Sequence, residues 1–185
     1  MKKKLMILAG GYSKERDISI ITGKEVYKAL KKKYTTILVD PKGDIVNKLR
    51  NFKPDIVFNA LHGRFGEDGY IQSIFENEKI CYTHSGVESS SLSIDKEISK
   101  SIFKKNNILT PKSFKYNLNS LTNNKRKLLK KIEKILKFPV VIKPLNEGSS
   151  VGVYICEKEN IFTFLKKLRD YNEVLIEKYI PGREI

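Results

Sequence analysis

Residues 143–152 read KPLNEGSSVG and connect two short apolar runs, one at 140–143 and one at 151–156. We expect each run to form a strand, and two strands joined by a loop this short pair antiparallel. Apolar residues at helical spacing then predict a helix over 161–168, and a further strand follows over 174–178. This half of the chain is therefore predicted to be an α+β domain built on an antiparallel sheet.

The first half of the chain alternates strands and helices instead. A strand buried on both faces is predicted by the continuous apolar run at residues 5–9, and further strands are predicted at 36–39 and 56–60. Helices are predicted by helical spacing over residues 18–30, 45–52 and 70–76. A βαβαβ order implies a parallel sheet with right-handed crossovers, which is a doubly wound, Rossmann-like α/β domain.

The two predicted domains meet near residue 93. A serine-rich segment at 89–93 fits the boundary, so we assign 1–92 to the α/β domain and 93–185 to the α+β domain. Isoleucines at 94, 98 and 102 recur every four residues, which predicts one helix with Ser93 as its candidate N-cap. Lys96 lies on the opposite face of that helix, where solvent is the default environment.

The chain ends on the residues PGREI at 181–185, a turn followed by an apolar residue that could begin another strand. The second domain also has too few predicted elements to close a core around its sheet. We therefore expect this sequence to be truncated and its second domain to be incomplete.

The composition, 185 residues of which 40% are hydrophobic, is typical of a soluble globular protein. The formal net charge of +15 raises the question of a nucleic-acid partner, but only six of the 36 basic residues are Arg, which base and phosphate readers favour. The densest basic run, at 125–137, carries apolar residues at helical spacing and is interpreted as an amphipathic surface helix. We expect no nucleic-acid partner.

Cys81 and Cys156 stand singly in apolar stretches, without the spacing of metal ligands, and are expected to be buried. The first apolar run covers only residues 5–9, whereas a secretory leader needs about 7–15 residues and a membrane span about 20. We expect a cytoplasmic protein with no membrane partner.

The loop at 143–152 combines features of a phosphate-binding segment. Gly148 and Gly152 allow the backbone to approach a ligand closely, and the amides of 148–150 can point several donors at one anion. Lys143, at the end of the preceding strand, adds a compact positive charge. The segment is not a P-loop, because a strand and not a helix follows it. On local evidence, an ordinary Gly-Ser hairpin turn is an equal alternative.

Glu15 and His62 follow the first and third predicted strands, at the edge where open α/β sheets bind ligands. A carboxylate at that edge can hold an ammonium group, and an imidazole can hold or polarise a carboxylate. Taken alone, Glu15 is more simply interpreted as a solvated loop charge and His62 as a histidine in a turn. The glycine-rich segment at 63–69, directly after His62, argues against a chance placement of these two residues.

Five segments, taken in order, resemble the motifs of one family. They are GGYSKERDIS at 10–19, ALHG and GEDG within 60–69, SIDK at 93–96, KP and EGSSVG within 143–152, and EKYI with Gly182 and Glu184 within 177–184. The family is that of the D-alanine–D-alanine ligases, in the ATP-grasp superfamily. The resemblance implies a pre-ATP-grasp N-terminal domain followed by an ATP-grasp domain that is only partly present.

The resemblance also implies a reaction and residues that serve it. ATP would phosphorylate the carboxylate of a first D-alanine, and the amine of a second D-alanine would displace phosphate from the acyl phosphate. Glu15 would hold the ammonium group of the first D-alanine, with Ile18 packing nearby, and His62 would orient its carboxylate. Ser149 would help to fix Glu15, so Glu15, His62 and Ser149 are the implied catalytic residues.

The implied ATP-binding residues fall into a phosphate group and an adenosine group. The phosphate group comprises Lys96, Lys143, Glu147, Gly148, Ser149 and Ser150. The adenosine group comprises Glu177, Lys178, Tyr179 and Ile180, which would line the adenine slot, and Glu184, which would reach the ribose.

The family uses Mg²⁺, whose acidic and amide ligands would lie beyond Ile185, together with an arginine that steadies the tetrahedral intermediate and a mobile closing loop. No metal ligand is therefore expected within this chain, and the 185 residues alone are expected to be inactive and poorly soluble. The resemblance further implies a role in peptidoglycan precursor synthesis and a homodimer at full length. His84 departs from the family pattern, which has a small residue at that position, and could alter the local turn.

Two alternatives stay open at the level of sequence. One is a related ligase that joins D-alanine to D-lactate or D-serine, because the residues that select the second substrate would lie outside the chain. The other is a non-catalytic module that binds ATP or an amino acid.

Overall fold

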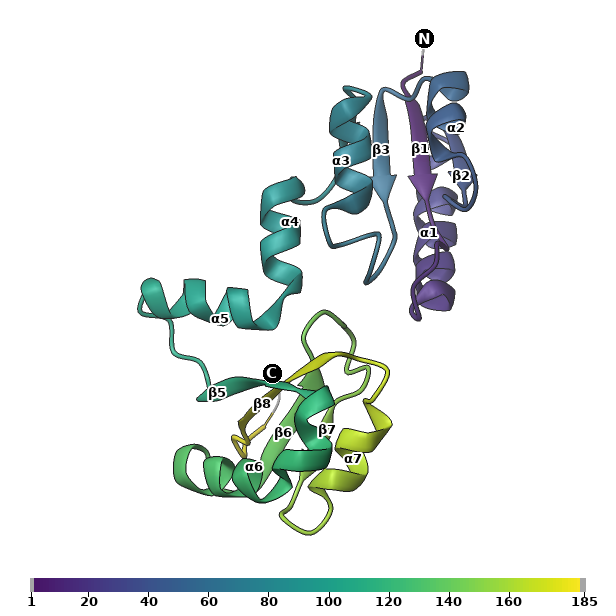
Figure 1. Cartoon of the computed structure of the whole chain (residues 1–185). Helices are drawn as coiled ribbons and strands as arrows, with labels where there is room; N and C mark the ends of the chain where they lie inside the picture. Colours follow the sequence, from purple (N-terminus) through teal and green to yellow (C-terminus); the bar gives the residue numbers. More distant parts are fainter. Residues whose placement is uncertain (1, 184–185) are drawn as a thin grey trace. The chain divides into compact units, whose positions relative to one another are not determined.

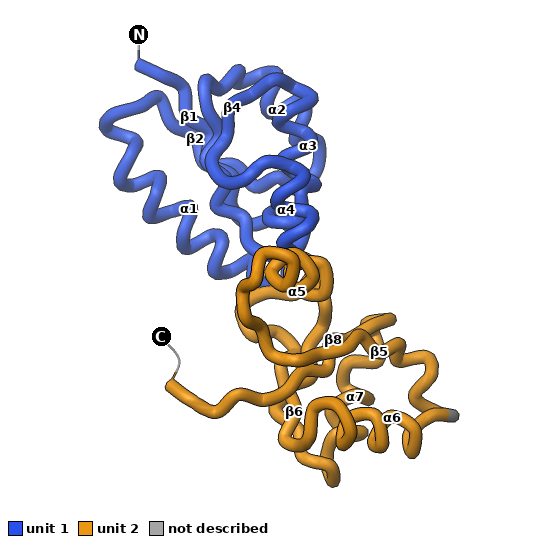
Figure 2. Tube along the Cα trace, turned by 90° about the vertical axis from the view of Figure 1, so that its left-hand side faces the viewer, with its two compact units in different colours: residues 1–94 blue, residues 95–185 orange. Residues whose placement is uncertain are grey.

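The computed structural model describes residues 2–183, except for the side chain of Asn123. It divides into two compact units, Met1–Ile94 and Asp95–Ile185 (Figure 2). Each unit has its own four-stranded sheet and its own hydrophobic core. No helix among the described residues is long and apolar enough to span a bilayer.

Unit 1 is built on a parallel sheet (Figure 1). Its strands are β1 (Lys4–Leu8), β2 (Thr35–Val39), β3 (Ile56–Asn59) and β4 (Cys81–Tyr82), in the order β2-β1-β3-β4. Its helices are α1 (Arg16–Leu30), α2 (Ile45–Phe52), α3 (Tyr70–Asn77) and α4 (Val87–Ile94). The strands β1, β2 and β3 all end at the same edge, so the loops that follow them gather there.

Helices pack on both faces of this sheet because its central strands are apolar on both faces. The helix α1 lies on the face that carries Leu5 and Ile7, and α2 and α3 lie on the face that carries Met6 and Leu8. Gly23 allows α1 to approach β1 closely, since a Cβ at this position would lie 2.3 Å from the Cβ of Ala9. This contact fixes the start of α1 beside the ligand edge of the sheet.

Unit 2 is built on an antiparallel sheet with the strand order β5-β8-β6-β7. Its strands are β5 (Ser113–Asn117), β6 (Val140–Pro144), β7 (Tyr154–Cys156) and β8 (Glu173–Lys178). Its helices are α5 (Lys96–Lys105), α6 (Leu121–Ile135) and α7 (Ile161–Lys167), with a 3₁₀ turn η1 (Leu118–Ser120) before α6.

The two faces of this sheet differ. Leu128 and Ile132 of α6 and Leu165 of α7 pack on the face formed by Ile142, Ile176 and their neighbours. Side chains alternate along a strand, so Lys143 of β6 and Glu177 of β8 belong to the opposite face. The face with the charged residues is the one that α5 approaches, as the contacts of Lys100 show below.

The predicted α/β architecture of a parallel sheet followed by an antiparallel sheet is confirmed. The antiparallel pairing of the strands that flank 143–152 is also confirmed, with Val141 opposite Ile155. The second flanking strand is shorter than predicted, because residues 151–153 form a turn before β7. The strands β4 and β5 were not anticipated.

The helix boundary near residue 93 is a correction. The serine-rich segment is helical, as part of α4, and Ser93 is not an N-cap. Asp95 caps α5, because its side chain accepts hydrogen bonds from the amides of Glu97 and Ile98. The expected single isoleucine stripe is therefore divided between two helices. An aspartate satisfies the first amides of a helix at least as well as a serine does.

Further local expectations concern Cys81 of β4, Cys156 of β7 and His84, which follows β4. Cys156 is buried as expected, but Cys81 is exposed, because β4 is a two-residue strand at the sheet edge. His84 has a φ of 83°, in the left-handed region that a side chain rarely adopts. Its ring packs edge-on against Phe58, which gives this unusual residue a local contact.

Candidate functional site

The loops after β1 and β3 are tied together by one buried serine of α1. The Ser19 hydroxyl accepts a hydrogen bond from the Gly10 amide at 2.8 Å and donates one to the Ala60 carbonyl at 2.7 Å. Ser19 is fully buried, so both backbone groups depend on it for a partner. The hydroxyl therefore fixes the separation of the two loops that carry Glu15 and His62.

The glycine-rich loop after β3 is folded back on the strand that precedes it. The Gly66 carbonyl accepts hydrogen bonds from the side-chain amides of Asn59 and Gln72, both at 2.8 Å. A Cβ at Gly66 would lie 2.5 Å from the Cβ of Leu61, so only glycine permits this close approach. The loop is held by buried polar groups and has a defined shape before any ligand binds.

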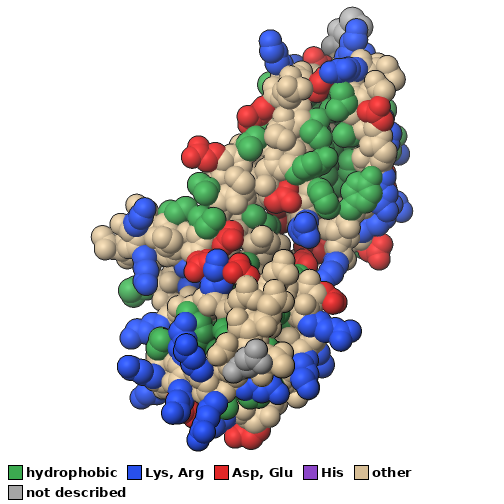
Figure 3. Space-filling view, viewed as in Figure 1, with side chains coloured by type: hydrophobic (Ala, Val, Ile, Leu, Met, Phe, Trp, Pro, Cys, Tyr) green, Lys and Arg blue, Asp and Glu red, His purple; other side chains and the backbone are tan. Residues whose placement is uncertain are grey.

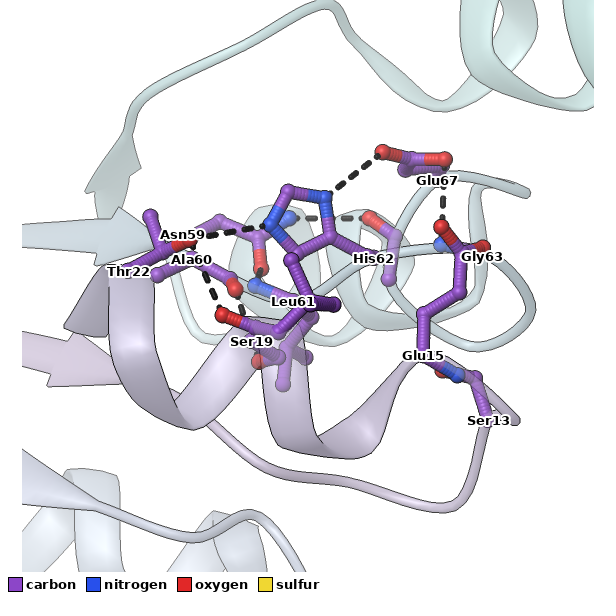
Figure 4. A network of polar contacts seen from close by, with 12 residues as sticks. Ser13, Glu15, Ser19, Thr22, Asn59, Ala60, Leu61, His62, Gly63 and Glu67 are labelled. Carbon is purple, nitrogen blue, oxygen red and sulfur yellow. Dashed lines mark hydrogen bonds and ion pairs between the residues drawn. The ribbon is translucent and has the colours of Figure 1, made fainter. Parts of the chain in front are cut away.

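Glu15, His62 and Glu67 come together at this edge (Figure 4). A Cβ at Gly63 would lie 2.7 Å from a carboxylate oxygen of Glu15, so the carboxylate rests directly over that glycine. The Nδ1 atom of His62 lies 3.6 Å from one oxygen of Glu67, whose other oxygen accepts a hydrogen bond from the Gly63 amide at 3.0 Å. Two carboxylates and an imidazole therefore surround one stretch of backbone, an arrangement that suits a cationic group.

The position of Glu15 has a second electrostatic consequence. Glu15 is the N-cap of α1 and is 9% exposed, with its carbonyl accepting the Ser19 amide at 3.0 Å. A carboxylate at a helix N-terminus is stabilised by the helix dipole. The Glu15 carboxylate therefore stands at the positive end of the α1 dipole, against the Gly63 backbone. Ile18, one turn further along α1, is exposed beside it.

Sequence reasoning missed two of the groups that hold His62. Its Nε2 atom lies 3.3 Å from the Thr22 hydroxyl, and its Nδ1 atom faces Glu67, as described above. Glu67 was visible only as part of the GEDG segment, and Thr22 stands two turns into a helix without a motif of its own. His62 also lines a cavity of about 90 Å³, whose walls include Tyr12, Phe65 and Tyr70.

In unit 2, a buried carboxylate is held by two lysines from different elements. Lys143 of β6 donates to the Oε1 atom of Glu177, and Lys100 of α5 donates to the Oε2 atom at 2.8 Å. Burial alone would raise the pKa of Glu177, but the hydrogen bonds from Lys100 and Lys143 outweigh it and lower that pKa below its ordinary value. Glu177 is therefore an anion with two positively charged partners.

Lys96 does not face solvent, which corrects the default expectation. It is half-buried, and its ammonium group donates to the carbonyls of Leu145, at 3.1 Å, and Glu147. Burial lowers the pKa of Lys96, and the positive charge of Lys143 lowers it further. Lys96 thus joins α5 to the loop after β6 and places a second ammonium near Lys143.

The loop itself has an uncommon backbone. Ser149 and Ser150 have φ values of 45° and 58°, so two consecutive non-glycine residues are left-handed. Such conformations cost about 1–3 kcal/mol each and concentrate at ligand-binding sites. The hydroxyl of Tyr171 donates to the Glu147 carboxylate at 2.7 Å and steadies the start of the loop. Gly148 accepts a turn hydrogen bond from the amide of Val151 at 2.9 Å.

The predicted adenosine group lies at the end of β8. Lys178 is exposed and its amide bonds to the Lys112 carbonyl, while Tyr179 is half-buried and Ile180 is 57% exposed. The Glu177 side chain is turned to Lys100 and Lys143. Glu184 lies outside the described residues. Lys96, Lys143, Glu147 and Glu177 are brought together around one sheet face by the contacts above.

The acidic and imidazole side chains of the described residues do not form a metal-ligand cluster. Within residues 2–183, no group of three or more His, Cys, Asp or Glu side chains is placed to hold a metal ion. The Lys and Arg side chains of unit 2 are spread over its visible face, without a single continuous stripe (Figure 3).

Comparison with known proteins finds D-alanine–D-alanine ligases that resemble this chain. A family model described as "D-ala D-ala ligase C-terminus" matches residues 102–185. Over 186 aligned residues, the chain is 60% identical to the D-alanine–D-alanine ligase of Pelagibacter ubique (strain HTCC1062), covering 100% of this chain and 60% of that relative. The chain is similar to D-alanine–D-alanine ligases over its whole length, and residues 102–185 match the model of their C-terminal part.

Solved structures of D-alanine–D-alanine ligases and a related ligase share its architecture. The ligase from Bacillus anthracis complexed with ATP superposes with a TM-score of 0.81 at 31% identity, covering 97% of this chain and 60% of that one. The VanG D-Ala:D-Ser ligase from Enterococcus faecalis superposes with a TM-score of 0.77 at 26% identity, covering 98% and 64%. The resemblance stated from the motifs is confirmed, and the chain spans about 60% of the length of its D-alanine–D-alanine ligase relatives.

Proposed function

We propose that the chain is part of an ATP-dependent ligase that joins two D-alanines through an acyl phosphate, for peptidoglycan precursor synthesis. The observation that carries this proposal is the pair Lys96 and Lys143, whose like charges lie close enough to lower the pKa of Lys96. Both ammonium groups lie beside a glycine-serine loop, and Lys143 shares the single Glu177 carboxylate with Lys100. A nucleotide phosphate chain would bring further negative charge to these lysines.

Unit 2 is proposed to hold the nucleotide. Lys143 and Lys96 would bind phosphate oxygens as point charges, and the loop 147–150 would direct backbone amides at the transferred phosphoryl group. Glu177, Lys178, Tyr179 and Ile180 would line the adenine slot, with Glu184 at the ribose. The B. anthracis relative solved with ATP supports a nucleotide as the ligand of this fold.

Unit 1 is proposed to hold the first D-alanine. The buried Glu15 carboxylate would bind the ammonium group, and His62, oriented by Thr22 and Glu67, would bind and align the carboxylate that is phosphorylated. The γ-phosphoryl group passes from ATP to that carboxylate and leaves ADP. The amine of the second D-alanine then attacks the acyl carbon, loses a proton, and phosphate departs. Positioning and charge neutralisation are the main demands of these steps.

The resemblance carries further parts of the proposal. Residues 1–92 would form a doubly wound, Rossmann-like substrate domain of the pre-ATP-grasp type, and residues 93–185 part of an ATP-grasp domain. The family implies a homodimer, a cytoplasmic enzyme and a requirement for Mg²⁺. The described residues offer no cluster for Mg²⁺, so the roles above rest on lysine, carboxylate and backbone groups alone.

A chimera tests this proposal. The aligned residues of the Pelagibacter ligase are replaced by this chain, which restores the length of the relative, and ADP release is measured with D-alanine, D-serine and D-lactate as second substrates. We expect ADP release that depends on D-alanine and a D-alanyl-D-alanine product. Release with D-lactate or D-serine alone would favour a related ligase, as the VanG relative illustrates. ATP and D-alanine binding without turnover would favour the binding-module alternative.

A further inference from the structure

Lys100 is a half-buried lysine that the proposed reaction does not use. Its ammonium group donates to the Pro111 carbonyl at 2.7 Å and to the Oε2 atom of Glu177 at 2.8 Å, and its side chain is 15% exposed. Lys143 takes the other oxygen of the same carboxylate, and its side chain is 21% exposed. One buried carboxylate therefore has two lysine partners, one on each oxygen.

The two lysines differ in how many other partners hold them. Lys100 has a second acceptor, the Pro111 carbonyl, which fixes its ammonium group between α5 and the segment before β5. Among residues 2–183, the hydrogen-bond partner of the Lys143 ammonium group is Glu177. Lys143 also stands beside Lys96 and the loop 147–150, where an anion would bind. Lys143 is therefore the partner that can exchange, and Lys100 is the partner that stays.

This difference matters because Glu177 is buried. If Lys143 turns its ammonium group towards a phosphate, a carboxylate that is 8% exposed loses one of its two counter-ions. A buried carboxylate without a counter-ion is costly, and it would also repel the phosphate beside it. A second lysine that keeps its hydrogen bond removes both penalties.

We propose that Lys100 is a positioning residue of the nucleotide site, which holds Glu177 through its Oε2 atom while Lys143 exchanges the Oε1 atom for a nucleotide phosphate. This inference deepens the proposed function and rests on it. Among the described residues, the charged groups that face Glu177 are Lys96 and Lys100 of α5 and Lys143 of β6. The competing explanation is a structural ion pair that only joins α5 to β8.

The first experiment needs no nucleotide. The carboxyl groups of the 185-residue chain are labelled with ¹³C, and the Glu177 signal is titrated in the wild type, Lys100→Met and Lys104→Met. Lys104 is the matched control, because it is an exposed lysine one turn further along α5. Lys100→Met should raise the pKa of Glu177, since it removes a hydrogen bond that lowers it, and Lys104→Met should not. An unchanged Glu177 titration in Lys100→Met would overturn the inference.

The second experiment measures ATP binding by calorimetry between pH 4 and 8, on the same three chains and on Lys100→Arg. In Lys100→Met, Lys143 is the remaining lysine partner of Glu177, and the carboxylate competes with the phosphate for it. We therefore expect ATP affinity to fall about tenfold at pH 8, of the order lost with one charged hydrogen bond. As the pH falls and Glu177 gains a proton, Lys143 is released and part of the affinity should return. Lys100→Arg keeps the charge and should retain most of the affinity.

The outcomes separate this inference from the proposed function. Equal ATP affinity and equal pH dependence in the wild type and Lys100→Met would overturn the positioning role while the nucleotide site stands. A Glu177 shift in the first experiment, with no ATP binding by the wild type, would overturn the proposed nucleotide site and the exchange with it. A loss of affinity that is the same at every pH would indicate a structural ion pair and would also overturn the exchange.

Discussion

The two candidate sites are held together in different ways. In unit 1, the acidic groups Glu15 and Glu67 are placed by backbone contacts, with Gly63 and Gly66 leaving no room for a side chain. In unit 2, the basic groups Lys96, Lys100 and Lys143 are placed by side-chain hydrogen bonds between separate elements. On the visible faces, hydrophobic side chains gather on unit 1 and basic ones are more frequent on unit 2 (Figure 3).

This difference indicates two kinds of ligand. A rigid carboxylate at a helix N-terminus suits a small cation such as an ammonium group, which needs one fixed partner. Several lysines around one buried carboxylate suit a polyanion, which can exchange with that carboxylate for Lys143. If the comparison is right, substitutions in one unit should weaken one ligand and leave the other unaffected.

Lys143→Ala is the change with the largest expected effect. It removes the ammonium group nearest to Lys96 and leaves Glu177 with Lys100 as its lysine partner. Removal of one partner from a partly buried charge pair costs about 2–5 kcal/mol, so the dissociation constant of ATP should rise by about a hundredfold or more. Calorimetric titration with ATP measures it. Lys134→Ala, an exposed lysine of α6, serves as the control, and ATP binding by Lys143→Ala at wild-type strength would remove the phosphate role.

Glu15→Gln is the matching test in unit 1. The substitution keeps the shape of the side chain but removes the charge that an ammonium group needs, and a charged hydrogen bond is worth about 1.5–3 kcal/mol. We expect D-alanine binding, measured by NMR titration, to weaken by up to about a hundredfold while ATP binding is unchanged. Glu25→Gln, on the exposed side of α1, should bind both ligands as the wild type does. Loss of ATP binding together with D-alanine binding would break the comparison between the units.

The same difference explains what could be predicted from the sequence. The parallel and antiparallel sheets follow from apolar runs and from the short connection at 143–152, because strand period and loop length are local properties. Glu15 and His62 could be located because strand ends converge on one edge of a parallel sheet. The family motifs add Lys96 and Lys143, since these stand within segments of recognisable composition.

The remainder depends on contacts between distant residues. Lys100 and Glu177 are 77 positions apart, and no spacing rule joins them. The partners of His62 are similar, because Thr22 lies 40 positions away on another element. The end of the helix at Ile94 was also missed, since serines that are poor helix formers are nevertheless helical in α4, where Ser90 is buried. Tertiary packing decided these features.

Ser19→Ala tests how rigid the unit 1 site is. It removes a hydroxyl that satisfies both the Gly10 amide and the Ala60 carbonyl in a fully buried position. Leaving buried polar groups without partners costs about 1–3 kcal/mol in the free energy of unfolding. Urea denaturation, followed through NMR signals of unit 1 residues, measures this loss of unfolding free energy. Ser73→Ala, on the exposed side of α3, serves as the control. A stability loss equal to that of the control would mean that water replaces the hydroxyl and that the loops are not fixed by it.

The smallest expected effect is the pH dependence that Lys96 gives to ATP binding. Burial lowers the pKa of Lys96, and Lys143 lowers it further. A bound phosphate favours the charged form of Lys96. ATP affinity should therefore decrease as the pH rises through the pKa of Lys96, which lies below the ordinary lysine value of about 10.4. The loss should be less than about tenfold per unit of pKa shift.

Calorimetry with ATP at pH 7.5, 9 and 10 measures this loss in the wild type and in Lys96→Arg. A guanidinium group stays charged throughout that range, so the arginine variant should lose less affinity than the wild type does. Equal losses in both chains would mean that the alkaline dependence does not come from Lys96. Lys96 would then serve only to join α5 to the carbonyls of Leu145 and Glu147. A reduced loss in Lys96→Arg would instead support direct contact between Lys96 and the phosphate, and with it the basic, exchangeable character of the unit 2 site.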